Sequence, residues 1–255
     1  FDHVPPPAAP AYISWDANAR KGELAGASTV DTTGEYHHIL NGTSATYQHR
    51  PYGLGPRVPM YVVSPWSKGG WVNSQVADHT SVIRFIEQRF GVREPNISAW
   101  RRAVCGDLTT CFNFADPNDA AFFSALPQTL ALANRARLLT GTTTPATPTG
   151  LVAPVQLSGV RPARALPYEL AAHAAVRSNP GRPGSGRIDI RFVNSGSAAA
   201  VIHAYNRLNL TAVPRRYTVE SGKQITDAWQ ADADGAYDLW RSEERRVGKE
   251  CRLTC

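Results

Sequence analysis

Residues 51–114 read PYGLGPRVPMYVVSPWSKGGWVNSQVADHTSVIRFIEQRFGVREPNISAWRRAVCGDLTTCFNF, and this stretch decides the fold. Its segment 59–64 is short, apolar and rich in β-branched residues, with a proline at its start and another directly after it. Such a run is typical of a buried strand. The loop 66–70 follows and ends on two glycines. We therefore expect a strand over 59–64 that leads into a loop.

A helix is predicted after this loop. Asp78, Thr80 or Ser81 can cap its first-turn N–H groups, and Gly91 can end it in a left-handed conformation. Its apolar positions recur at three- and four-residue steps: Val82, Ile83, Ile86 and Phe90. A strand, a loop and a helix N-terminus in this order form the place where open α/β sheets bind anionic ligands. The pattern predicts a scaffold of this kind and does not by itself specify a function.

The pattern changes after residue 166. Residues 187–193 alternate strictly between polar and apolar side chains and are followed by a turn at 194–196. Further short strand patterns follow at 199–205, around Tyr217 and Val219, and at 236–239. Short strands about ten residues apart, with turns between them, indicate an antiparallel sandwich.

Three long blocks carry a resemblance to a known family: GLGPRVPMYVVSPWSKGGWV (53–72), DHTSVIRFIEQRFGV (78–92) and NISAWRRAVCGDLT (96–109). They resemble the bacterial phosphocholine-specific phospholipases C, a phosphoesterase family in the alkaline-phosphatase-like superfamily. The opening FDHVPPP and the run STVDTTGEYHH (28–38) are similar to the same family, as is the region after Pro167.

The resemblance implies an α/β catalytic-domain fragment of the alkaline-phosphatase-like type, followed by a small all-β sandwich domain. We expect residues 1–137 to be the C-terminal part of the catalytic domain, 138–166 a Pro-rich linker and 167–240 the β-sandwich domain. Residues 241–255 are charged and lack a strand period, so we interpret them as a non-native tail and exclude them from the fold.

The resemblance implies hydrolysis of phosphatidylcholine to diacylglycerol and phosphocholine. Sphingomyelin is the second substrate that it suggests. The family uses a threonine nucleophile and a divalent metal ion. Both the nucleophile and the metal ligands are expected upstream of residue 1, so we expect this chain alone to be inactive. An acid-phosphatase-like phosphomonoesterase and a non-catalytic lipid- or carbohydrate-binding module are the alternatives.

His79, Asp78 and His3 are candidates for a catalytic role. His79 follows the predicted strand by one loop and lies at a helix N-terminus, where it either approaches the phosphoryl group or anchors the loop through Asp78. His3 beside Asp2 either serves a metal or proton transfer, or fixes a proline-stiffened loop. The pair Arg101-Arg102 can bind carboxylates or a phosphate, and the sequence leaves both open.

Aromatic residues are candidates for binding the substrate head group. Phosphocholine carries a quaternary ammonium, which aromatic faces attract. Trp66 and Trp71 flank a glycine-containing loop, and Tyr52 lies within residues 11–58, which we expect to be long irregular structure. Core packing of the two tryptophans is the competing interpretation.

Other histidines and cysteines leave alternatives open. His37, His38 and His49 form either a metal cluster or a set of surface histidines on a loop. Cys105 and Cys111 are either a disulfide of an exported protein or two unpaired thiols. No pattern of Cys and His with zinc spacing occurs.

Composition narrows the class of partner. The net charge of +6 is not gathered in a basic run before residue 241, which argues against nucleic-acid binding. No apolar run approaches the ~20 residues that a membrane-spanning helix needs. We expect a phospholipid substrate at a membrane surface and, as for the family, a secreted or periplasmic parent protein.

Overall fold

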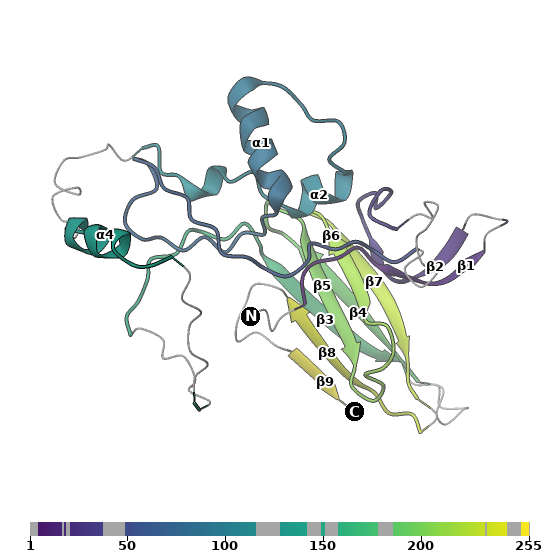
Figure 1. Ribbon diagram of the computed structural model, residues 1–255. Coiled ribbons are helices and arrows are strands. Elements are labelled where there is room, and N and C mark those ends of the chain that lie inside the picture. Colours follow the sequence, from purple (N-terminus) through teal and green to yellow (C-terminus); the bar gives the residue numbers. More distant parts are fainter. Residues whose placement is uncertain are drawn as a thin grey trace.

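The computed structural model describes residues 5–16, 18, 21–37, 49–115, 128–141, 149–150, 158–177, 186–232, 234–243 and 251–254. Two β-sheets lie face to face, with α1 and α2 at one end of them and α4 set apart (Figure 1). The helices are α1 (His79–Phe90), α2 (Ala99–Val104), the 3-10 helix η2 (Thr109–Cys111) and α4 (Leu130–Arg137).

The larger sheet has the strand order β1-β2-β6-β5-β8-β9 and the smaller one has the order β3-β4-β7. Their bounds are β1 Ala11–Asp16, β2 Lys21–Ser28, β3 Leu170–Arg177, β4 Arg187–Asn194, β5 Ala200–Asn206, β6 Arg215–Val219, β7 Gln224–Gln230, β8 Asp238–Glu243 and β9 Cys251–Thr254. Neighbouring strands are antiparallel except β2 and β6, which are parallel. Strands β3 to β8 therefore form the β-sandwich expected after residue 166, but its larger sheet is mixed and also contains β1, β2 and β9.

An apolar core lies between the two sheets. The alternation in β4 buries one side of that strand, and Phe192 packs in a tilted arrangement against Tyr217 of β6, with 4.6 Å between the ring centroids. Both rings are fully buried. The core is completed by Ile188, Ile190, Ile202, Ala204, Val219, Ile225, Trp229 and Leu239. Burial of these side chains on both sheets is what holds the layers together.

The N-terminal strands belong to the same sheet as the C-terminal ones. Gly26 of β2 faces Arg216 of β6, and a Cβ at Gly26 would lie 1.9 Å from the backbone oxygen of Arg216. Its φ of +109° also favours glycine. The backbone of β2 can therefore approach β6 only because residue 26 lacks a side chain.

A second core joins α2 to this sheet. Trp100 of α2 is fully buried and donates from Nε1 to Oγ1 of Thr218 at 2.9 Å. Val76, Val104 and Tyr168 pack in the same cluster, and Tyr168 Oη accepts from the N–H of Val76 at 3.0 Å. Segments separated by more than a hundred residues thus share one core.

Helix α1 begins and ends where the sequence predicts. Asp78 accepts from the N–H of Thr80, while Ser81 Oγ accepts from the N–H of Asp78, which closes a capping box. Gly91 adopts φ 69° and its N–H bonds to the carbonyl of Glu87. Ser98 caps α2 by accepting from the N–H of Arg101 at 3.0 Å.

Three expectations about secondary structure are wrong. Residues 59–64 form no strand, and Tyr61 and Val63 are 87% and 92% exposed, because no described segment pairs with them. Residues 11–28 carry β1 and β2 instead of irregular structure, since pairing with β6 orders them. The tail is not free of strands, because β8 runs to Glu243 and β9 pairs with it.

The Pro-rich segment is attached to the preceding part of the chain where it is described. The N–H of Val72 donates to the carbonyl of Pro162, and the N–H of Arg164 donates to the carbonyl of Val72. Both bonds are 2.9 Å long. A short helix that the sequence suggests at 120–126 lies outside the described residues.

We predict that burial of His203 makes stability fall in mildly acidic solution. Burial and the nearby Arg216 lower the pKa of this β5 side chain from 6.5 to about 3. The unfolded chain therefore binds a proton that the folded chain excludes, so stability is lost as pH falls from 6.5 towards 3. By pH 4 this loss is about 3 kcal/mol. Urea unfolding of the wild type and of His203→Leu at pH 7 and pH 4 measures it.

The exposed His173 of β3 provides the control. His173→Leu should keep the wild-type dependence on pH, whereas His203→Leu should have a shallower one. Equal slopes for all three proteins would contradict a proton-excluding site at His203.

Candidate functional site

A cavity of about 470 Å³ lies at the N-terminus of α1. One part of its wall is apolar and includes Leu54, Val58, Met60 and Val82. The polar part of its lining consists of Arg57, Asn73, Ser74, Gln75, Asp78 and His79. An apolar wall with a few polar groups at one end is typical of a small-molecule site.

Asp78 is held in this cavity by three partners. Its Oδ1 accepts from the N–H and the hydroxyl of Thr80, at 2.9 and 2.6 Å. Its Oδ2 accepts from Arg101 Nη1 at 2.7 Å, and only 9% of the side chain is exposed. These contacts fix the direction in which α1 begins and hence the place of His79, which is exposed at the cavity.

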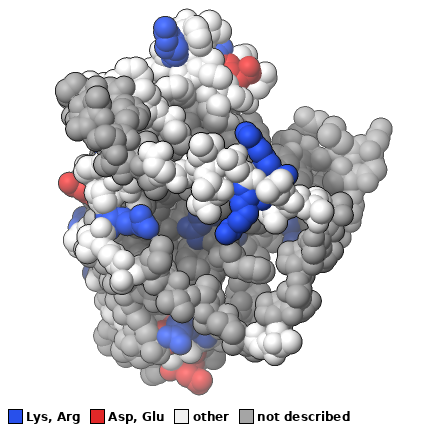
Figure 2. Space-filling model, turned by 60° about the vertical axis from the view of Figure 1, so that its left-hand side comes forward, with Lys and Arg blue, Asp and Glu red and all other residues white. Residues whose placement is uncertain are grey.

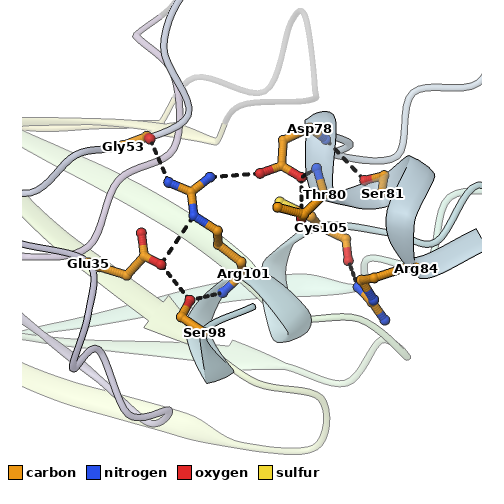
Figure 3. A network of polar contacts seen from close by, with 9 residues as sticks. All are labelled: Glu35, Gly53, Asp78, Thr80, Ser81, Arg84, Ser98, Arg101 and Cys105. Atoms are coloured by element: carbon orange, nitrogen blue, oxygen red, sulfur yellow. Dashed lines mark hydrogen bonds and ion pairs between the residues drawn. The ribbon is translucent and has the colours of Figure 1, made fainter. Parts of the chain in front are cut away.

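Arg101 of α2 is the centre of a buried polar network (Figure 3). Its Nε lies 3.2 Å from Oε1 of Glu35, and its Nη2 donates to the carbonyl of Gly53 at 3.1 Å. Burial acts to lower the pKa of Arg101, but the hydrogen bond to Asp78 and the charges of Glu35 and Asp78 outweigh burial and raise it. Arg101 therefore remains a cation that joins three separate loops.

Glu35 is the acid of this network that is furthest from solvent. Its residue is 2% exposed and its Oε1 also accepts from the hydroxyl of Ser98. Its Oε2 is buried and has no hydrogen-bond partner among the residues that the structure describes. A buried carboxylate with one bare oxygen depends on its single cation for compensation.

The residues predicted from sequence do not all lie together. Asp78 and His79 line the large cavity, and Trp71 lines a neighbouring cavity of about 160 Å³. The two cavities share Met60, Asn73, Gln75, Val76 and Ala77. Tyr52 packs instead against His37, with ring centroids 4.1 Å apart, and Trp66 against Phe114, at 5.8 Å. His3 lies outside the described residues.

Trp71 already has a cation on its ring. The guanidinium of Arg164 lies 4.6 Å from the ring centroid, and Arg164 Nη2 donates to the carbonyl of Cys111 at 3.2 Å. The face of Trp71 is therefore shared with the Pro-rich segment, which the sequence did not suggest. A choline group would have to displace Arg164 or use another face of the ring.

The histidine-rich loop forms no metal centre in the part of the chain that the structure describes. His49 stacks on Trp15 at 3.9 Å and His37 contacts Tyr52. Across the described ranges, no group of three or more His, Cys, Asp or Glu side chains could hold a metal ion. The described residues therefore do not fit the divalent metal that the family resemblance implies.

In the part of the face that Figure 2 describes, Lys and Arg side chains lie at several places, and some of them adjoin near its centre. Among the described helices, none has the length and hydropathy required to cross a bilayer. Arg101 and Arg102 both bind carboxylates, the latter through two 2.8 Å bonds to Glu87, which answers the question that the sequence left open.

Arg101, Glu35 and Arg164 are the polar residues of this region whose roles the sequence did not reveal. Glu35 and Arg101 are 66 positions apart, and neither lies in a motif with fixed spacing. The only local signal was the arginine pair in the first turns after Ser98.

Two parts of the chain match known protein families. Residues 1–93 match the Phosphoesterase family, and residues 162–242 match the family described as bacterial phospholipase C, C-terminal domain. Residues 1–93 are therefore similar to the phosphoesterases, and residues 162–242 are similar to the C-terminal domain of the bacterial phospholipases C.

Its curated relatives include phospholipases C from several bacteria. It is 51% identical to the non-hemolytic phospholipase C of Pseudomonas aeruginosa and 45% identical to that of Burkholderia pseudomallei, each over 94% of this chain and 32% of the relative. It is 38% identical to the hemolytic phospholipase C of P. aeruginosa over 84% of this chain and 30% of that protein. The chain thus spans about a third of the length of these relatives.

We predict that Arg101 is required for stability. Arg101→Met leaves the buried Glu35 without a cation, which should cost about 3–5 kcal/mol. Urea unfolding at neutral pH measures this, and adding Glu35→Gln to Arg101→Met should restore part of the loss. Arg89→Met, on an exposed arginine of α1, is the matched control and should cost less than about 0.5 kcal/mol. Equal losses for the two arginine variants would contradict the role of the network.

We also predict that Cys105 resists alkylation. The structure has Cys105 and Cys111 as free thiols, so the disulfide alternative is not realised. Burial raises the pKa of Cys105 strongly, and the neighbouring Asp78 adds to the shift. Because the thiolate is the reacting form, Cys105 should react with iodoacetamide far more slowly than the half-exposed Cys111.

Peptide mapping by mass spectrometry after a short exposure distinguishes the two thiols. Concentrated urea should make both react. Fast labelling of Cys105 in the native protein, or a peptide linking Cys105 to Cys111, would be inconsistent with the structure.

Proposed function

We propose that this chain is part of a phospholipase C that hydrolyses the glycerol-side phosphodiester of phosphatidylcholine, releasing diacylglycerol and phosphocholine. The observation that carries the proposal is 51% identity, over 94% of the chain, to a protein named non-hemolytic phospholipase C. Sphingomyelin is a second substrate that contains the same phosphocholine group.

The cavity at α1 is our candidate for the contact with the substrate's phosphate-bearing part. Asp78 already occupies the helix N-terminus with a negative charge, so attraction of a phosphate there depends on side chains instead of the helix dipole. Arg57 and His79 line the cavity and can donate to phosphoryl oxygens. The apolar wall of Leu54, Val58 and Met60 suits the glycerol and proximal acyl carbons.

In this proposal the residues have different roles. His79 contacts the phosphoryl group or transfers a proton to it, and Asp78 positions His79 through the capping box. Trp71 and Tyr52 are exposed aromatic residues that can contact a choline head group, 46% and 49% of their surfaces being accessible. Trp66 and His3 remain proposed contacts on the basis of the family resemblance.

The reactive centre of the proposed enzyme includes a threonine nucleophile and a divalent metal ion. A metal ion supplies Lewis-acid stabilisation of the charged phosphoryl oxygens. Because the described residues contain no suitable ligand group, this metal would be bound by residues other than those. What this part of the protein supplies is the wall, the phosphate contacts and the β-sandwich.

We also propose the finer architecture and location. Residues 1–137 form part of an alkaline-phosphatase-like α/β domain, 138–166 a linker, and 167–240 a β domain that contacts the lipid surface or the catalytic domain. The parent enzyme acts outside the cytoplasm, where phosphatidylcholine of other cells is accessible.

We predict that a chimera containing this chain will prefer a phosphocholine diester. In the chimera, residues 1–243, which include the whole of β8, replace the matching third of the non-hemolytic phospholipase C of P. aeruginosa. It should hydrolyse p-nitrophenyl phosphorylcholine in preference to p-nitrophenyl phosphate, while purified residues 1–255 alone should hydrolyse neither. His79→Ala should lower kcat/KM at least about tenfold, the usual minimum for loss of an acid–base or phosphate contact.

His173→Ala is the matched control, because His173 is an exposed histidine of the β domain that does not line the cavity. It should leave kcat/KM unchanged. Preference for the monoester would favour the phosphomonoesterase alternative. A folded chimera that hydrolyses neither substrate yet binds lipid or glycan would favour the non-catalytic module.

A further inference from the structure

Helix α1 is amphipathic, but its polar side faces the protein and its apolar side is exposed, which is the opposite of a normal surface helix. Its polar side faces the rest of the chain: Ser81 is fully buried and Arg84 donates to the carbonyl of Arg102 at 3.0 Å. Glu87 forms two hydrogen bonds to Arg102, and these lower its pKa to about 2. The polar side of α1 is therefore fixed against α2 by hydrogen bonds and charge.

The apolar side of α1 faces away from the described chain. Val82, Ile83 and Ile86 are all classed as exposed, and Phe90 is 68% exposed. Val82 also lines the large cavity together with Val58 and Met60, which joins the helix surface to the segment before it. We call the surface formed by these residues the α1 apolar face: Val58, Met60, Val82, Ile83, Ile86 and Phe90. In a soluble protein, a continuous apolar surface of this kind marks an interaction site.

The segment beside this face has the composition of a strand without strand partners. Residues 59–64 are apolar and β-branched, yet Tyr61 and Val63 are almost fully exposed. Ser67 Oγ donates to the carbonyl of Val62 and accepts from the N–H of Ser64, so pairing of this segment with the edge of a sheet would exchange these two bonds for bonds to a strand. In an α/β domain, helices pack their apolar faces on a sheet of paired strands. Helix α1 and residues 59–64 have the apolar surfaces that such packing requires, but in the described chain nothing covers them.

The match to the Phosphoesterase family indicates which polypeptide covers the α1 apolar face. The α1 apolar face lies wholly within residues 1–93, the part that matches the Phosphoesterase family. The matched region is only 32% of the non-hemolytic phospholipase C of P. aeruginosa, so that protein has about two thirds of its length available to cover this face. We propose that the α1 apolar face is an intramolecular interface of the family: the rest of the phosphoesterase polypeptide packs on it, with residues 59–64 joining its sheet as a strand.

A membrane surface fits the same residues less well. A helix that lies in a membrane interface keeps its charged side in water. In α1 that side is taken up by contacts with Arg102 and the carbonyls of α2, so it cannot face water when the apolar side is buried. The inference concerns packing only and does not depend on which substrate the enzyme hydrolyses.

The test compares the effect of the same substitutions in two contexts. Ile83→Glu with Ile86→Glu should change the melting temperature of residues 1–255 by less than about 2 °C, since both side chains are already exposed. In the chimera with the P. aeruginosa relative it should lower the melting temperature by more than about 6 °C or prevent folding. Ile83→Ala should show the same contrast on a smaller scale, so that a variant that folds is always available.

Val176→Glu and Leu210→Glu are matched controls, because both residues are exposed apolar residues outside the α1 apolar face. They should be tolerated in both contexts. Hydroxyl-radical footprinting gives a second measurement: Met60 and Phe90 should be oxidised at least tenfold more slowly in the chimera than in residues 1–255. If the chimera is recovered unfolded, glutamates at the aligned positions of the intact P. aeruginosa relative provide the comparison.

Equal tolerance in both contexts, or equal oxidation of Met60 and Phe90, would overturn the inference. So would a dimer of residues 1–255 that Ile83→Glu with Ile86→Glu dissociates, which would make a second copy the occupant. Loss of binding to phosphatidylcholine vesicles in that variant, with unchanged stability of the chimera, would make the membrane the occupant. The readouts are stability and protection, so failure of the phospholipase proposal would leave them unaffected.

Discussion

The guanidinium of Arg101 is the contact on which the arrangement of the α-helical part depends. It binds the carboxylate of Glu35, the carboxylate of Asp78 and the carbonyl of Gly53, and each comes from a different loop. Desolvating one cation with two acids is favourable only when the geometry is close and the remaining polar atoms are bonded. Ser98, the cap of α2, provides a further bond to Glu35 and so couples the start of α2 to the same centre. The direction of α1, the site of His79 and the shape of the cavity all follow from this centre.

Local signals in the sequence were sufficient for helices α1 and α2 and for β4, β5, β6 and β8, whereas α4 was not predicted. The cap at Asp78, the stop at Gly91 and the cap at Ser98 each involve residues within four positions of one another, so they can be read from a single stretch. The alternation over β4 likewise identified a strand with one buried side. β3 and β7 were missed because their alanine, histidine and glutamine content weakens the alternation, although they pair on either side of β4.

Contacts between residues that are far apart in the chain could not be predicted from the sequence. The period of α1 specified an apolar stripe but not what it faces, and the structure has that stripe exposed while Ser81 and Glu87 face α2. The apolar run at 59–64 had the composition of a strand but lacks a partner among the described residues. At the site, Asp78 and His79 were found because they lie at a helix start, whereas the pairing of Arg101 with Glu35 and of Arg164 with Trp71 joins distant segments.

The parallel pairing of β2 with β6 has a consequence for how such proteins can evolve. Because Gly26 lets an N-terminal strand extend the sheet of the C-terminal domain, that domain is not a self-contained cassette. Recombination that transferred only the segment after the Pro-rich region would leave β6 as a bare edge and Trp100 without Thr218. Inheritance of the two parts together is therefore favoured by hydrogen bonding and burial alone, whatever reaction the enzyme performs.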